Sequence, residues 1–128
     1  MKLLLDTCTF LWIAWDDQEL SLKARQLFSD PANRVFLSSV SCWEIAIKYG
    51  MGRLPLPEDP GRLVPAQRER HAIEPLLLDE DSALSVHRLP DHHRDPFDRM
   101  LISQAIGGGL TILTPDRIFS SYPVRIAW

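Results

Sequence analysis

Short, continuous apolar runs alternate along the chain with longer segments whose apolar residues recur at helical spacing. The continuous runs at residues 3–5, 35–37 and 110–113 are typical of strands buried on both faces of a parallel sheet. We expect two further strands, at residues 71–78 and 124–127. Pro75 restricts the first of these to a sheet edge or to its own end, because proline cannot donate to a strand ladder.

Helices are expected between these strands, because apolar residues three and four positions apart form a face that packs on a sheet. The first carries Leu11, Trp12 and Trp15. The others are expected at residues 22–29, about 40–49, about 60–70, 79 to about 88, 96 to about 106, and around 118–122. Strands that alternate with helices predict an α/β sandwich with a mostly parallel sheet. No repeat, low-complexity tract or boundary interrupts this order, so we expect residues 1–128 to form a single domain.

Composition narrows the class of protein. Net charge is −3, so no basic surface indicates nucleic-acid binding, and a polyanion would need local basic patches or metal ions. Cys8 and Cys42 are the only cysteines, which fits a reducing compartment. Asp6 interrupts the first apolar run, so no signal peptide is visible, and the apolar stretch at residues 10–15 is too short to cross a bilayer. We therefore expect a cytoplasmic protein that does not enter the membrane.

One predicted helix places an acid where an apolar residue belongs. Asp95 is a good N-cap, Pro96 suits the first helical position, and Gly107 begins a triple-glycine stop. Asp98 lies on the apolar face of this helix, which is formed by Leu101, Ile102 and Ala105. A carboxylate on a core-facing surface is costly unless something binds it, so Asp98 is a candidate functional residue.

Three more acids occupy comparable places. Asp6 and Asp116 each follow a predicted strand, at the edge of an open α/β sheet where ligands bind. Glu44 allows two interpretations. It matches the capping-box spacing with Ser41, so it could cap its own helix. It also shares an apolar helix face, could pair with Lys48, and could point towards Asp6.

Carboxylates that gather at one edge of a sheet repel one another, and at least one should have a raised pKa. Bound Mg²⁺ or Mn²⁺ relieves this repulsion, and such ions prefer oxygen ligands. A two-metal site can stabilise both oxygens of a phosphodiester displacement. The chain has no zinc-spaced His/Cys set, no Walker loop and no G-x-S-x-G elbow. Catalysis by a divalent metal ion that is held by carboxylates is therefore the best-supported enzymatic interpretation.

Four motifs together resemble the PIN-domain proteins, and most of all the VapC toxins of bacterial toxin–antitoxin pairs. In chain order these motifs are Leu-Leu-Leu-Asp6-Thr7, Ser-Cys-Trp-Glu44-Ile45, Arg-Asp-Pro-Phe-Asp98-Arg99 and Leu-Thr-Pro-Asp116. The resemblance covers essentially the whole chain. It implies a PIN-domain-like three-layer α/β/α sandwich and a magnesium-dependent endoribonuclease. It also implies a homodimer, inhibited by a VapB-like antitoxin.

The resemblance assigns the metal-binding and catalytic site to Asp6, Glu44, Asp98 and Asp116. Asp6 and Asp98 are expected to hold the principal metal, Glu44 a second metal or the attacking water, and Asp116 to act through a water on the metal. Proline precedes Asp116 here, where the family often has arginine.

Other residues near these motifs have open roles. Thr7 and Thr114 either orient the carboxylates or serve as ordinary capping and turn hydroxyls. The arginines nearest the motifs either hold phosphates or are solvated surface charges: Arg53, Arg94, Arg99 and Arg117. His92 and His93 are expected to be loop residues outside an all-oxygen metal site. Trp12, Trp15 and the 51–56 link are expected to leave apolar surface for a dimer mate or antitoxin.

Three other functions use the same acids. The protein could be a metal-dependent DNA nuclease or phosphodiesterase, since no feature indicates recognition of the 2′-OH. It could also be a catalytically silent PIN binding module. A phospho-acceptor regulator is disfavoured, because the chain has no suitably placed lysine on a late strand and the acid order differs.

Overall fold

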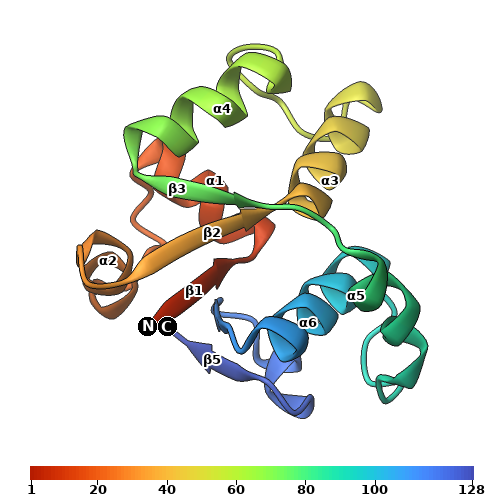
Figure 1. Ribbon diagram of the computed structural model, residues 1–128. Coiled ribbons are helices and arrows are strands. Elements are labelled where there is room, and N and C mark those ends of the chain that lie inside the picture. The colour runs from red at the N-terminus through yellow and green to blue at the C-terminus, as the bar shows by residue number, and fades with distance from the viewer.

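A five-stranded, fully parallel sheet forms the centre of the computed structural model, which describes residues 1–128 (Figure 1). The spatial order is β3-β2-β1-β4-β5. The strands are β1 (Lys2–Leu5), β2 (Arg34–Ser38), β3 (Ile73–Leu76), β4 (Thr111–Leu113) and β5 (Arg125–Ala127). All four strand pairs are parallel, which confirms the expected sheet. β3 lies at the edge, as Pro75 predicted, but is shorter than the expected 71–78.

Helices cover both faces of the sheet. They are α1 (Thr7–Trp15), α2 (Leu22–Ser29), α3 (Ser39–Gly50), α4 (Pro60–Arg70), α5 (Glu80–Ser85) and α6 (Pro96–Gly108), with 3₁₀ turns at Val86–Arg88 and Arg117–Ser121. Figure 1 shows α1 and α4 on one side of the sheet and α5 and α6 on the other. The three-layer α/β/α arrangement is thus confirmed. No helix combines the length and apolar character that a membrane span requires.

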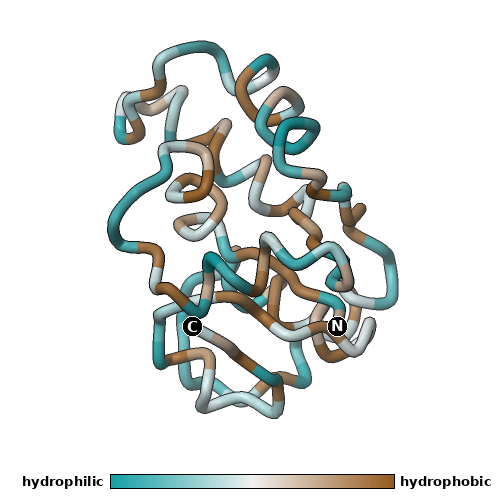
Figure 2. The backbone as a smooth tube through the Cα atoms, turned by 90° about the vertical axis from the view of Figure 1, so that its left-hand side faces the viewer, coloured by the Kyte–Doolittle hydropathy of each residue, from teal (hydrophilic) through white to brown (hydrophobic).

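Each face of the sheet has its own hydrophobic core. Leu3 and Leu5 point to the core formed with α1 to α4, whereas Leu4 points to the core formed with α6. All three side chains are fully buried, because β1 lies between β2 and β4. In Figure 2 the central strands are accordingly among the most hydrophobic parts of the tube. Continuous apolar runs therefore became strands because both sides of each strand are covered.

α4 has the bounds expected for it, whereas the helix expected after Asp79 is shorter than predicted. α4 continues through Pro65, although proline removes one helical hydrogen bond. Leu63 and Val64, beside it, are both buried, so packing holds this turn in place. The segment expected to be helical to about Arg88 is α-helical only to Ser85 and then tightens into a 3₁₀ turn. That turn begins the segment that leads to α6.

Candidate active site

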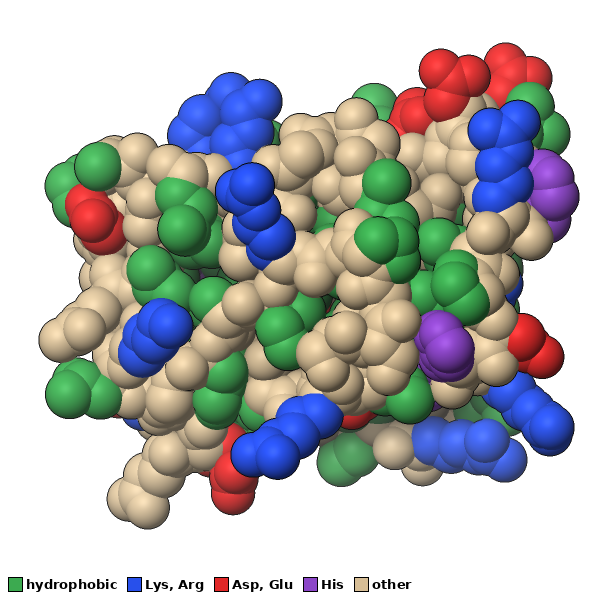
Figure 3. Space-filling model, turned by 90° about the horizontal axis from the view of Figure 1, so that it is seen from below, with side chains coloured by type: hydrophobic (Ala, Val, Ile, Leu, Met, Phe, Trp, Pro, Cys, Tyr) green, Lys and Arg blue, Asp and Glu red, His purple; other side chains and the backbone are tan.

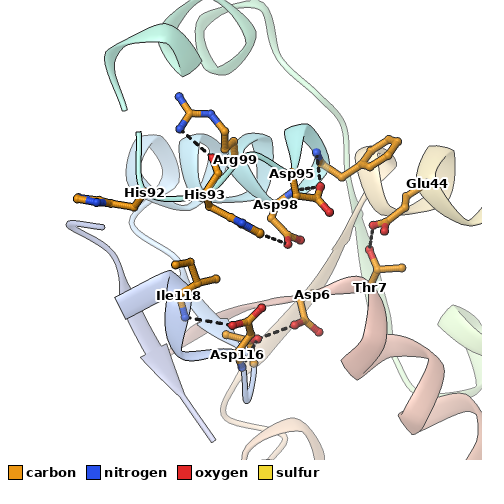
Figure 4. A network of polar contacts seen from close by, with 12 residues as sticks. Asp6, Thr7, Glu44, His92, His93, Asp95, Asp98, Arg99, Asp116 and Ile118 are labelled. Carbon is orange, nitrogen blue, oxygen red and sulfur yellow. Dashed lines mark hydrogen bonds and ion pairs between the residues drawn. The ribbon is translucent and has the colours of Figure 1, made fainter. Parts of the chain in front are cut away.

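The parallel strands bring the four candidate acids to one edge of the sheet. Asp6 follows β1 and Asp116 follows β4, while Glu44 and Asp98 lie on α3 and α6. All four line one pocket of about 330 Å³. Figure 4 shows Asp98 and Asp116 facing each other beside Asp6, with Glu44 further along the same edge. The expectation that these acids gather is confirmed.

Asp6 is held rigidly in this pocket. It is the N-cap of α1, and one carboxylate oxygen accepts a hydrogen bond of 2.7 Å from the Thr9 backbone N–H. The other oxygen accepts a hydrogen bond of 2.5 Å from the Thr114 hydroxyl. Burial raises the pKa of Asp6, and these hydrogen bonds oppose the rise. Asp6 thus carries an unfavourable buried charge that a cation would stabilise.

Glu44 faces the site and does not cap its helix. α3 begins at Ser39, and the N-cap is Ser38, whose hydroxyl accepts from the Val40 N–H. Ser41 therefore lies inside the helix, where its buried hydroxyl has no hydrogen-bond partner, and the capping-box interpretation was wrong. The Thr7 hydroxyl donates to Glu44 Oε1 at 2.6 Å, and Lys48 pairs with Oε2. The pairing with Lys48 is confirmed.

The two threonines support the carboxylates, as one of their interpretations predicted. Thr7 binds Glu44, and Thr114 binds Asp6. The Thr114 hydroxyl also accepts from the Asp116 N–H at 3.1 Å, so it serves as a turn hydroxyl as well. Hydroxyl donors of this kind fix the orientation of carboxylates that bind metals.

Asp98 lies in the first turn of α6, behind the Asp95 N-cap, which accepts from the Phe97 and Asp98 N–H groups at 2.9 and 3.1 Å. The Asp98 side chain is 19% exposed. Burial raises the pKa of Asp98 to about 6, the hydrogen bond from His93 opposes the rise, and the charges of Asp95 and Glu44 add to it. The expected raised pKa is thus found at both Asp6 and Asp98.

Sequence reasoning missed His93. Its Nε2 lies 2.8 Å from Asp98 Oδ2, and one ligand atom each from His93, Asp98 and Asp116 lie within 4.8 Å of one another. Figure 4 shows the His93 ring pointing into the site, while His92 points away. The sequence did contain one signal for this role: the loop that carries His93 leads directly into Asp95, the N-cap of the helix that carries Asp98.

The contacts of Arg99 contradict the interpretation of this residue as a phosphate ligand. Its guanidinium donates to the backbone carbonyls of Pro90, His93, Val86 and Leu89 at 2.9 to 3.4 Å. It also donates to the Tyr122 hydroxyl at 3.2 Å. Arg99 therefore fastens the segment before α6 to the helix, and this segment carries His93.

Asp116 completes the cluster from the opposite side. It accepts from the Ile118 N–H at 3.1 Å and so caps the following 3₁₀ turn. Its side chain is exposed, and its charge contributes to the raised pKa of Asp6. Pro115 does not move Asp116 away from the site, since both residues line the pocket.

The donors in this pocket fit a divalent metal ion. Carboxylate oxygens are the ligands that Mg²⁺ and Mn²⁺ take. Asp6 is buried and Asp98 is half-buried, and the charged form of each is disfavoured. A cation between them would favour ionisation and remove the repulsion. The second pocket, of about 790 Å³, is lined by Arg34, Gln104 and Arg88 among others and shares no residue with the acid cluster.

Comparison with known proteins identifies the family of the chain. Ribonuclease VapC16 of Mycobacterium tuberculosis is 39% identical over 66 residues, which is 52% of this chain but only 45% of that protein. VapBC2 of Rickettsia felis, solved on a promoter DNA fragment, superposes with a TM-score of 0.72 at 16% identity over 99% of this chain and 98% of that one. DNA-bound VapBC of Salmonella typhimurium gives 0.68 at 21% identity over 99% and 97%. The PIN-domain family model matches residues 3–124, and the chain therefore belongs to the PIN-domain family.

Proposed function

We propose that this protein is a metal-dependent endoribonuclease that acts as the toxin of a toxin–antitoxin pair. The observation that carries this proposal is the convergence of four acids in one pocket of a PIN-domain fold. The name of the VapC16 relative supports ribonuclease activity, and the VapBC complexes support a toxin role. We extend the proposal to the whole chain, 1–128, as a single PIN domain.

The chemistry is hydrolysis of an RNA phosphodiester bond. A bound Mg²⁺, or Mn²⁺, would supply positive charge for the phosphate and lower the pKa of a water molecule. Asp6 and Asp98 are proposed to hold the principal ion. Glu44, fixed by Thr7 and Lys48, orients the attacking water or holds a second ion. Asp116, which is more exposed, holds a water molecule at the mouth of the site.

RNA is proposed to bind chiefly through the metal site, because the chain is acidic overall. Figure 3 shows Lys and Arg side chains spread around one face of the molecule, with no continuous basic stripe there. Arg94, which is exposed, and Arg53 and Arg117 remain candidate phosphate contacts. A metal-dependent DNA nuclease is the competing function, because the site has no identified contact to a 2′-OH.

Two protein partners belong to the proposal: a VapB-like antitoxin and a second copy of this chain. Trp15 is 44% exposed and Met51 57% exposed, so large apolar side chains remain on the surface as expected. Trp12 is only partly buried, and its ring lies 5.8 Å from that of Trp128. An antitoxin of this kind would act in the cytoplasm, where we place the protein.

The test is cleavage of labelled RNA and of single- and double-stranded DNA in Mg²⁺, in Mn²⁺ and in EDTA. Asp98→Asn should lower the rate about 100-fold or more, on the scale of losing one electrostatic group in an active site. Its circular dichroism spectrum should match wild type. Asp91→Asn, an exposed acid of the same segment, is the matched control and should cleave normally.

Three results contradict the proposal. Cleavage by Asp98→Asn at the wild-type rate, or cleavage in EDTA, refutes the metal mechanism. Faster cleavage of DNA than of RNA establishes the competing nuclease function. Absence of cleavage of either substrate by the metal-loaded wild type favours the catalytically silent binding module.

A further inference from the structure

His93 lies where a metal ligand would lie. Its Nε2 is 2.8 Å from Asp98 Oδ2, and ligand atoms of His93, Asp98 and Asp116 all lie within 4.8 Å of one another. Ligands of a six-coordinate ion at about 2.1–2.2 Å are separated by about 3.0 Å when adjacent and about 4.3 Å when opposite. The three donors therefore fit around one ion with little rearrangement.

The backbone that carries His93 is held in place by other parts of the protein. The Tyr122 hydroxyl accepts from the backbone N–H of His93 at 2.8 Å, and Arg99 donates to the His93 carbonyl at 3.4 Å. The His93 ring also lies edge-on to Phe119, with 6.5 Å between ring centroids. Contacts to three separate residues thus hold one imidazole nitrogen beside the Asp98 carboxylate before any ion binds.

The neighbouring histidine also donates its backbone N–H to the Tyr122 hydroxyl, at 3.2 Å, but its ring contacts no carboxylate. His92 is exposed, and its ring packs on Tyr122, with 5.3 Å between centroids, without reaching a carboxylate. Figure 4 shows the two rings pointing in different directions. The chain therefore contains a matched control for His93 at the adjacent position.

We propose that His93 is a nitrogen ligand of the principal ion, which Asp98 holds and which Asp116 approaches from the opposite side, and that His93 makes the site favour Mn²⁺ over Mg²⁺. Imidazole is a good ligand for first-row transition metals, whereas Mg²⁺ takes oxygen ligands and gives up its water reluctantly. An otherwise carboxylate site gains little Mg²⁺ affinity from this ring but gains Mn²⁺ affinity. This inference rests on the proposed metal site and adds to it the preferred metal.

A simpler role for His93 is to donate a hydrogen bond to Asp98 and thereby orient it, without contacting the ion. The two roles differ in what they predict for the bound metal. A ligating nitrogen couples magnetically to Mn²⁺, whereas a nitrogen that touches only the carboxylate does not show direct coupling. Glutamine at position 93 can keep a donor near Asp98 but removes the imidazole.

The experiment is electron spin-echo spectroscopy of Mn²⁺ bound to the wild type, His93→Gln and His92→Gln, with calorimetric titrations of Mn²⁺ and Mg²⁺. We expect directly coupled ¹⁴N in the wild type and in His92→Gln, and its loss in His93→Gln. His93→Gln should also lose about tenfold or more in Mn²⁺ affinity, with less than about threefold change for Mg²⁺.

Each alternative has its own outcome. Bound Mn²⁺ without nitrogen coupling in the wild type overturns ligation by His93 while leaving the metal site intact. Equal losses of Mn²⁺ and Mg²⁺ affinity in His93→Gln overturn the proposed preference for Mn²⁺. Failure of the wild type to bind either ion refutes the metal site of the proposed function itself.

Discussion

Asp98→Asn should make the metal-free protein more stable while weakening its response to metal. Burial raises the pKa of Asp98 from 3.8 to about 6 in the folded state. The folded protein therefore binds this proton more tightly than the unfolded chain does. As pH rises through 3.8 and then through about 6, the free energy of unfolding falls, and above that range the loss is complete.

The size of this effect follows from the shift. About two pKa units correspond to roughly 3 kcal/mol at neutral pH, at about 1.4 kcal/mol per unit. Asparagine has nearly the same shape, carries no charge, and keeps an oxygen that can accept from His93. Asp98→Asn should thus gain up to about 3 kcal/mol over the wild type in EDTA at pH 7.5, or roughly 10 °C in Tm for a chain of this size. At pH 4 and below, where the wild-type carboxyl is protonated in the folded state, most of the difference should vanish.

Thermal melts followed by circular dichroism measure the difference in stability between Asp98→Asn and the wild type. One series is run in EDTA at several pH values, and a second at pH 7.5 with increasing Mg²⁺ or Mn²⁺. Metal should stabilise the wild type by mass action, by about 2.7 kcal/mol at a hundred times Kd, and the variant by less. Asp91→Asn should melt as the wild type does. If Asp98→Asn melts lower in EDTA at pH 7.5 and responds to metal like the wild type, Asp98 is a structural acid and the site is misplaced.

Two other residues yield predictions from their hydrogen bonds. Arg99→Met removes the guanidinium bonds to four backbone carbonyls of residues 86–93 and should cost about 2–4 kcal/mol in urea unfolding. Arg94→Met, at an exposed position, should cost little, and equal losses would contradict the fastening role of Arg99. Thr7→Val removes the hydroxyl that donates to Glu44 and should weaken metal binding about tenfold, as measured by calorimetry. The Tm should change by no more than a few degrees. An unchanged metal affinity would show that Thr7 does not orient a ligand.

The arrangement of the acids was predictable because it depends on few facts. Residues 3–5 form a continuous apolar run and residues 110–113 a run of apolar and β-branched residues, and such runs are typical of buried parallel strands. Once the strands are parallel, the residues that follow them share one edge, which places Asp6 and Asp116 together. The boundaries of the elements were less predictable. The ends of β3 and the 3₁₀ turn at residues 86–88 depend on tertiary packing, which the spacing of apolar residues in the sequence does not reveal.

The roles of Glu44 and His93 depend on contacts between distant segments. Whether Glu44 caps its helix or faces the site depends on where α3 begins, and both Ser38 and Ser41 are acceptable caps. The contact that decides its role comes from Thr7, which is 37 residues away. His93 enters the site because Arg99 and Tyr122 hold its backbone. Neither contact leaves a pattern of spacing in the sequence.

The hydrogen bond from Thr114 to Asp6 joins residues 108 positions apart, and the Thr9 hydroxyl likewise donates to the Leu113 carbonyl across 104 positions. β1 is made first during synthesis, yet it cannot form its second ladder until β4 has emerged. Contacts of such long sequence separation form slowly, because the loop between them must close first. The pocket therefore cannot assemble before the chain beyond β4 has been made, so the four acids come together only when synthesis of the fold is almost complete.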